Sequence, residues 1–348
     1  MRLPFPMPPA IQAYLHHAYT TGVVEGLGHP WALSNEYINL EVRVNDRYSG
    51  TSLFMDITPW TDLAAFEQQG LCLTVTRSAE EIASMPATHL AATLRKLLVE
   101  GRYVEAYVDE YFIPPSAHFR SKHQNHALLV VGFDDSTGSF DAVIYNKEGR
   151  FVISKIEAEI LCHAIAMQPR LNAPYTADKA LREIGRGSVS AEPGLDLKRI
   201  RDGLTGFLSP RNSLIFDEAW LDRVDTGTTG FVYGHLCYEY VGAGIRRAYE
   251  RGGAIDLRQT RLIWERVKIG VRRVRQLAEA EIVPGEVESE WRRLAGCLHR
   301  VHLMAFQHNL DRQRGRAIRR ESALPVLHAA ITLERGLTER VVAAINSV

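Results

Sequence analysis

The sequence is poor in cysteine. Its 348 residues include four, Cys72, Cys162, Cys237 and Cys297, and no two of them form a CxxC pair. This spacing argues against a zinc knuckle and against a disulfide framework. Each of the four lies in an apolar run, which predicts buried thiols in a reducing cytoplasm.

Long apolar runs are also absent. No stretch of about 18 apolar residues occurs, so the sequence predicts no transmembrane helix. The N-terminal stretch MRLPFPMPPA is too rich in proline for the core of a signal peptide. We therefore expect a cytoplasmic protein that has no membrane partner.

An excess of either charge is the third absence. The 41 lysine and arginine residues balance 41 aspartate and glutamate residues, which argues against a general attraction to nucleic acid or to an anionic membrane. The stretch "GLG" at 26–28 lacks the rest of a nucleotide-binding fingerprint, and no Walker sequence occurs. We expect no nucleotide and no cofactor.

The first half of the chain contains alternating strand and helix signals. The stretches at 36–44 and 71–76 predict strands, and Ser78 with Glu81 predicts a capped helix that breaks near Pro86. Three further strands are expected from "YVEAYVDEYF", "HALLVVGF" and "FDAVIYN", with the last two joined as a hairpin. The strand "FVISKI" and an apolar helix then complete this half.

Beyond residues 169–174 the strand signals fade and helical spacing dominates, with helices expected at 257–280, 286–306 and 323–345. The arginine-rich helix at 257–280 is either a solvated face or a dock for an acidic carrier protein. The sequence therefore predicts an α+β protein. Residues 1–168 form a domain with an antiparallel sheet, and residues 175–348 form a mainly helical domain.

The histidine at the start of the strand "HALLVVGF" is the main catalytic candidate. Adjacent antiparallel strands can place the imidazole of His126 beside the amide of Asn146, which follows the next strand. Asp109 and Glu110 end the preceding strand, and alternation lets at most one of them face His126. Together with His123 they are candidates for binding a substrate amine. As an alternative, His118, His123 and His126 supply ligands for a metal ion.

A family resemblance rests on the same stretch. The run "HALLVVGFDD", with "VDEYFIP" before it and "YNKEGRF" after it, resembles the N-terminal domain of the butirosin biosynthesis protein H family. It resembles more loosely the papain-like peptidases that trim bacteriocin leaders. The resemblance implies a papain-like fold that handles acyl thioesters, with His126 as general base and Asn146 as its orienting residue.

The family's cysteine nucleophile is missing. Its pattern corresponds here to Ala18-Tyr19-Thr20-Thr21-Gly22, with Tyr19 at the position of the cysteine. Three readings stay open. Thr20 or Thr21 replaces the thiol, His126 activates an acceptor amine directly, or the domain binds without catalysis.

The leading functional expectation is an accessory enzyme of secondary-metabolite assembly. It would act by transfer, cyclisation or hydrolysis on an acyl or peptidyl thioester, with a carrier protein and a small-molecule acceptor as partners. The first alternative is a non-catalytic binding or scaffold protein of a biosynthetic complex. The second is a metal-dependent enzyme that uses the histidine cluster.

Overall fold

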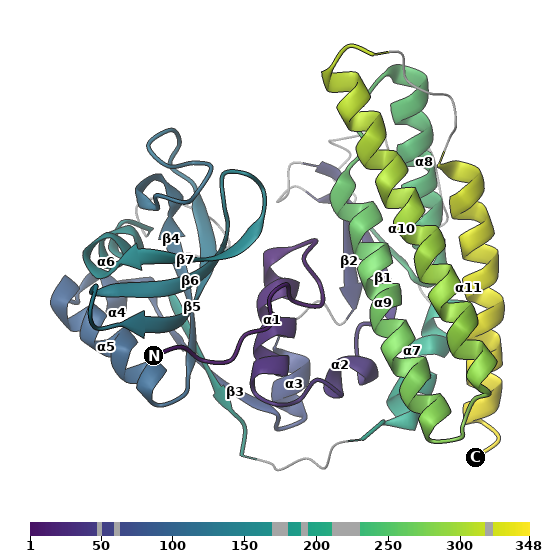
Figure 1. Ribbon diagram of the computed structural model, residues 1–348, viewed down its shortest axis with the longest axis horizontal. Helices are drawn as coiled ribbons and strands as arrows, with labels where there is room; N and C mark the ends of the chain where they lie inside the picture. Colours follow the sequence, from purple (N-terminus) through teal and green to yellow (C-terminus); the bar gives the residue numbers. More distant parts are fainter. Residues whose placement is uncertain (47–50, 59–62, 169–179, 189–193, 211–229, 317–322) are drawn as a thin grey trace. The chain divides into compact units, whose positions relative to one another are not determined.

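The structure is a computed structural model that describes residues 1–46, 51–58, 63–168, 180–188, 194–210, 230–316 and 323–348. It combines helices with antiparallel strands and is mainly helical toward the C-terminus, which confirms the predicted α+β class (Figure 1). The chain divides into two compact units. The first comprises Met1–Pro30 and Asp62–Glu192, and the second comprises Trp31–Thr61 and Pro193–Val348.

A six-stranded antiparallel sheet lies at the centre of the first unit, in the order β3-β8-β4-β5-β6-β7. Its strands are β3 (Cys72–Arg77), β4 (Tyr103–Asp109), β5 (Asn125–Asp134), β6 (Ser139–Tyr145), β7 (Phe151–Glu157) and β8 (Leu181–Arg186). The helices of this unit are α1 (Leu15–Gly26), α3 (Ala64–Gln68), α4 (Ala79–Ala83), α5 (Ala87–Val99), η1 (Glu110–Phe112) and α6 (Ala158–Met167). The predicted hairpin is confirmed, because β5 pairs antiparallel with β6.

One face of this sheet packs on α4, α5 and α6. Successive side chains of a strand point to opposite faces, and Val104, Ala106 and Val108 of β4 all enter the core that these helices complete. Leu94 of α5 and Leu161 of α6 are fully buried in the same core. Apolar alternation in the sequence therefore fixes which face of β4 meets the helices.

The helix pair predicted around Ser78 and Pro86 is confirmed. Ser78 Oγ accepts a hydrogen bond of 3.1 Å from the backbone amide of Glu81 and caps α4. Pro86 separates α4 from α5, since proline has no amide proton for a continuing helix. The chain then leaves α5 through Gly101, whose φ of 77° favours glycine.

The two units differ from the boundaries expected from the sequence. Strand β8 lies beyond residue 168, yet it inserts between β3 and β4 of the first sheet. Its charged residues obscured the strand pattern in the sequence. Glu183 is buried, and it pairs with Arg77 at 2.6 Å and with Arg102 at 3.0 Å. Conversely, residues 31–61 belong to the second unit, where their hairpin pairs with a strand near residue 230.

The second unit contains a three-stranded antiparallel sheet in the order β2-β1-β9 and a set of long helices. Its elements are α2 (Ala32–Asn35), β1 (Asn39–Asp46), β2 (Thr51–Thr58), α7 (Leu197–Leu208), β9 (Gly230–Tyr233), η4 (Gly234–Leu236), α8 (Cys237–Arg251), α9 (Leu257–Glu279), α10 (Gly285–Gln313) and α11 (Leu324–Ile345). Helix α10 packs against α9 and α11 (Figure 1). Among the described residues, no helix is both long and apolar enough to cross a bilayer.

Two arginines of α9 are buried, although the sequence suggested that its basic residues lie largely outside. Arg266 forms an ion pair with Glu334 of α11 and donates to the carbonyl of Ile38 at 2.7 Å. Arg273 donates to the carbonyls of Ser34 and Glu36, at 2.6 and 2.7 Å. These guanidinium groups therefore tie the segment before β1 to the long helices.

Candidate functional site

The junction between β4 and β5 brings together the acids and histidines that the sequence singled out. Val108 pairs with His126 across the two strands. Directly after β4 the chain enters η1, and the Glu110 amide donates to the carbonyl of Gln124 at 2.9 Å. This turn places two consecutive carboxylates, those of Asp109 and Glu110, beside the first residues of β5.

Glu110 holds the ring of His126. Its Oε1 lies 3.0 Å from His126 Nδ1, and its Oε2 lies 3.8 Å from His118 Nε2. The Glu110 side chain is only 7% exposed, whereas the His126 side chain is 46% exposed. A buried carboxylate that accepts from Nδ1–H leaves Nε2 as the free base of the imidazole. The pair therefore presents an oriented base to solvent.

Asp109 makes a second acid–imidazole pair with His123. The Asp109 Oδ2 atom lies 2.6 Å from His123 Nδ1, and Oδ1 accepts from the backbone amides of Tyr111 and Gln124 at 3.1 and 3.3 Å. The His123 ring also stacks on Tyr111, with centroids 4.2 Å apart. The two acids thus serve different histidines, as strand alternation predicted.

Asn146 has a different role from the predicted one. Its Oδ1 accepts hydrogen bonds from the backbone amides of Glu148 and Arg150, at 3.1 and 2.9 Å. These bonds close the turn between β6 and β7. In the structure Glu110, and not Asn146, contacts Nδ1 of His126. The sequence offered a signal for this, since an acid directly after the strand that pairs with a histidine can fold back onto it.

Tyr19 is a buried structural residue. Its hydroxyl lies 3.0 Å from the carbonyl oxygen of Ala127 and 3.1 Å from that of Val143, on β5 and β6. Burial, with the nearby charges of Glu105 and Glu110, raises the pKa of this phenol well above its usual value. A phenol that stays protonated and donates to two strands is a poor nucleophile. Tyr19, at the position expected for the cysteine, therefore links α1 to strands β5 and β6.

The two threonines after Tyr19 are equally unsuited to replace the cysteine. Thr21 Oγ1 donates to the carbonyl of His17 at 2.8 Å, a bond within α1 itself. Thr20 is buried, and its hydroxyl has no hydrogen-bond partner among the described residues. Within the described part of the chain, neither hydroxyl is bonded to His126.

We expect Tyr19→Phe to lower the free energy of unfolding by about 1–3 kcal/mol, because the buried carbonyl of Val143 and the part-buried carbonyl of Ala127 lose the hydroxyl that they share. Urea denaturation measures this loss. Tyr111→Phe is the control, since no hydrogen bond of its hydroxyl occurs among the described residues, and should be near neutral. If Tyr19→Phe lost activity while its free energy of unfolding stayed unchanged, Tyr19 would have a direct role in the chemistry.

The cysteines offer no substitute in the first unit. Burial raises the pKa of Cys72 to about 12 and that of Cys162 to about 11. Thiols of this kind remain protonated near neutral pH and are weak nucleophiles. Cys237 and Cys297 belong to helices of the second unit, and Cys237 is fully buried.

The predicted histidine cluster does not converge on one point. Among the described residues, no three ligand atoms from His118, His123, His126, Asp109 and Glu110 lie within 4.8 Å of one another. His123 Nδ1 and His126 Nδ1 each face one acid, and His118 Nε2 lies 3.8 Å from the second oxygen of Glu110. Among the described residues, this junction therefore holds acid–imidazole contacts and not three converging ligand atoms.

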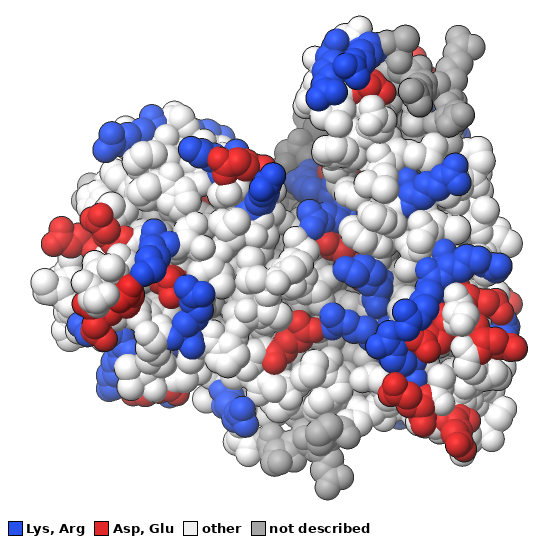
Figure 2. Space-filling model, in the orientation of Figure 1, with Lys and Arg blue, Asp and Glu red and all other residues white. Residues whose placement is uncertain are grey.

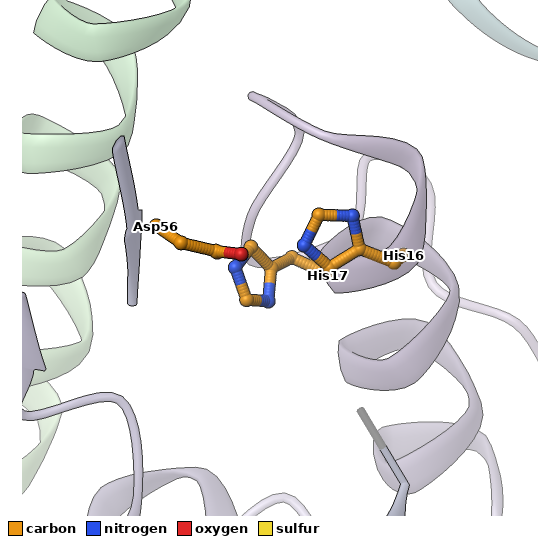
Figure 3. Close-up of side chains that lie close together, drawn as sticks. All are labelled: His16, His17 and Asp56. Carbon is orange, nitrogen blue, oxygen red and sulfur yellow. The ribbon is translucent and has the colours of Figure 1, made fainter. Parts of the chain in front are cut away.

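A second histidine pair lies at the start of α1. Figure 3 shows His16 and His17, whose ring centroids are 4.2 Å apart. The Tyr14 ring stacks on His16 at 5.6 Å. Asp56, drawn with them, belongs to β2 of the second unit. Sequence analysis did not single out this pair, because two consecutive histidines match no ligand or catalytic spacing by themselves.

The long helices of the second unit contain an aromatic cluster. The Trp264 ring stacks on His299, with centroids 4.1 Å apart, and His302 Nδ1 lies 2.9 Å from Thr260 Oγ1. Burial, with the neighbouring Arg261 and His299, lowers the pKa of His302 to about 4. His302 is therefore neutral in the folded protein at neutral pH.

This shift predicts a pH-dependent stability. The unfolded chain binds a proton at His302 near pH 6.5 and the folded chain only near pH 4, so stability is lost as the pH falls through this window. Thermal unfolding at pH 7 and pH 5 measures the loss. His302→Gln should narrow the difference in Tm, and the exposed His328→Gln should not. An equal change in Tm between pH 7 and pH 5 in the wild type and in both variants would contradict the assignment of this pH dependence to His302.

Charges of both signs are interspersed on the face of the molecule shown in Figure 2, with basic side chains gathered over α9 and α10. Two arginines of α9 form ion pairs: Arg261 with Glu265, and Arg275 with Glu288, at 2.8 and 2.9 Å. With Arg266 and Arg273 buried, α9 offers less free positive charge than its sequence suggests.

Compared with protein-family models and with curated proteins, the chain matches none of them. The site is therefore interpreted from its own geometry. That geometry comprises one oriented and half-exposed imidazole, a second acid–imidazole pair beside it, and a buried tyrosine at the position expected for a nucleophile.

Proposed function

We propose that the first unit catalyses acyl transfer, with His126 as a general base that Glu110 orients. The observation that carries this proposal is the 3.0 Å contact between Glu110 Oε1 and His126 Nδ1, made by a buried carboxylate to a half-exposed ring. A base positioned in this way contributes about 100- to 10,000-fold to a proton-transfer step.

The transfer is direct, without an acyl-enzyme. Tyr19, Thr20 and Thr21 are buried, and Cys72 and Cys162 have raised pKa values, so these groups do not supply an attacking atom. The amine of the acceptor attacks the thioester carbonyl, its C–N bond forms, and Nε2 of His126 takes the amine proton. The C–S bond then breaks, and the proton passes to the leaving thiolate.

The substrate class follows from the resemblance of residues 103–154 to the butirosin biosynthesis protein H family. It suggests an acyl or peptidyl thioester on a carrier protein as the donor and a small amine as the acceptor, in secondary-metabolite assembly. Asp109 and His123 lie next to the catalytic pair on the same turn. Asp109 is buried and already bonded to His123 and to two backbone amides, so the more exposed His123 ring is the group that this pair offers to the acceptor.

A non-catalytic binding protein is the second candidate, and one observation favours it. The Tyr19 hydroxyl bonds both β5 and β6, so the site of the expected nucleophile is closed by a structural contact. A papain-like domain that lost its thiol could keep this packing and bind a carrier complex. This candidate predicts complex formation without turnover.

The two candidates are separated by an acyl-transfer assay. Acyl-pantetheine thioesters are incubated with a primary amine and the full chain, and the amide is quantified by mass spectrometry. The proposal predicts amide formation above the uncatalysed rate, and its loss in His126→Ala. Equal rates with the protein, with the variant and without protein would reject catalysis.

A further inference from the structure

A cavity of the first unit lies beside the turn that carries Asp109 and Glu110. It has a volume of about 770 Å³ and lies where the segment 111–120 meets the beginnings of α5 and α6. This volume is in the range that holds drug-sized ligands, roughly 300–1,000 Å³. We call it the aromatic pocket and define it by Ala91, Tyr111, Phe112, Phe119, Arg120 and Glu159.

The lining of the aromatic pocket is largely apolar. Tyr111, Phe112 and Phe119 are all half-buried and leave ring surface toward the cavity. The edge of His163 packs against Phe112, with ring centroids 4.5 Å apart at 88°. Exposed aromatic surface that lines a concave site favours apolar or aromatic groups of a ligand.

Two residues of opposite charge line the aromatic pocket. Arg120 and Glu159 both line the cavity and both are exposed, and neither forms an ion pair among the described residues. Arg120 lies over the Phe119 ring at 5.0 Å. Its φ of 53° is uncommon for a residue with a side chain, and its amide bonds the Tyr111 carbonyl at 3.0 Å. The fold therefore fixes Arg120 at the cavity.

Another cavity of this unit shows the contrast. It has about 620 Å³ and is lined by Arg77, Arg102 and Glu183, together with Lys96 and Glu100. There the charges neutralise one another, since Glu183 pairs with both arginines and Glu100 with Lys96. Among the described residues, the charges that line this cavity are thus paired, whereas Arg120 and Glu159 of the aromatic pocket are not.

We infer that the aromatic pocket binds a short apolar peptide with free ends. The guanidinium of Arg120 pairs with the peptide carboxylate, Glu159 pairs with its ammonium group, and the rings hold the apolar side chains. Glu159 lies in the first turn of α6. The site does not use His126, so it stands apart from the proposed acyl transfer.

Calorimetry on the full chain tests this inference with the dipeptide Leu-Phe. Two analogues each remove one charge: N-acetyl-Leu-Phe lacks the ammonium group, and Leu-Phe amide lacks the carboxylate. We expect each analogue to bind about tenfold more weakly than the dipeptide, the loss of one charge-assisted contact. Ala91→Phe, which fills the cavity, should abolish binding of all three.

The charge variants assign each contact. Glu159→Gln should bind Leu-Phe and its N-acetyl form equally, and Arg120→Gln should bind Leu-Phe and its amide equally. Lys147→Gln and Glu148→Gln, exposed on the β6–β7 turn, are the matched controls and should bind as the wild type does. Absence of binding to the folded wild type, or selectivity that survives both charge variants, overturns the inference.

Discussion

Glu334→Gln will destabilise the second unit by about 3–5 kcal/mol, the usual cost of removing one partner of a buried ion pair. Both members are almost inaccessible, with side chains 3% exposed for Arg266 and 1% for Glu334. Tyr238 donates to Glu334 and lies 3.0 Å from Arg266, so the variant also disturbs a third buried group. Urea denaturation followed by circular dichroism measures the loss.

The control for this variant is Glu339→Gln, an exposed glutamate on the same helix. Its expected effect is within about 0.5 kcal/mol. The double variant Arg266→Met with Glu334→Leu should recover much of the lost stability, since it leaves no unpaired buried charge. If Glu334→Gln unfolded at the same urea concentration as the wild type, the buried pair would not hold α9 to α11.

His126→Gln will lower the rate of acyl transfer by about 100- to 10,000-fold, while the protein keeps its fold. The ring is half-exposed, so the substitution leaves no cavity in the core. Glu110→Gln should lower the rate less, because the imidazole remains but loses the carboxylate that selects its tautomer. Initial rates of amide formation measure both effects.

His118→Gln is the matched control for these variants. It lies in the segment between η1 and β5 and faces the other oxygen of Glu110, at 3.8 Å. We expect its rate to stay within a few-fold of the wild type. A drop as large as that of His126→Gln would mean that the loop as a whole, and not one imidazole, supports the reaction.

The central sheet of the first unit was largely predictable from the sequence. Apolar alternation marked β5 and β6, and the Asp134–Gly138 turn joined them as expected. The Ser78 capping box marked the start of α4. These signals are local, so neighbouring residues determine them without reference to the rest of the fold.

Contacts between distant residues were not predictable in the same way. The charged strand β8 reads as a surface segment until Arg77 and Arg102 are seen to neutralise Glu183. Arg266 reads as a solvated residue until its partner 68 positions away is known. Only the fold brings such pairs together. The periodicity of apolar residues in the sequence predicts an exposed position for each charged residue by itself.

The candidate site was predicted in part. His126 was identified from its place at the start of a strand, but its orienting partner was not, because η1 turns Glu110 back over the sheet. Tyr19 was predicted to stand at the position of the family's cysteine, and its bond to two strands follows only from the packing of α1. Local sequence thus located the candidate histidine, and tertiary structure defined its surroundings.

The proposal of direct transfer is tested most directly by initial velocities of amide formation over a matrix of thioester and amine concentrations. Transfer without an acyl-enzyme predicts intersecting double-reciprocal lines and no acyl adduct on the protein by intact mass. Parallel lines with an acylated protein would show a covalent nucleophile, and a velocity equal to the uncatalysed rate would show a binding protein. Either result contradicts His126 and Glu110 as the base of a direct acyl transfer.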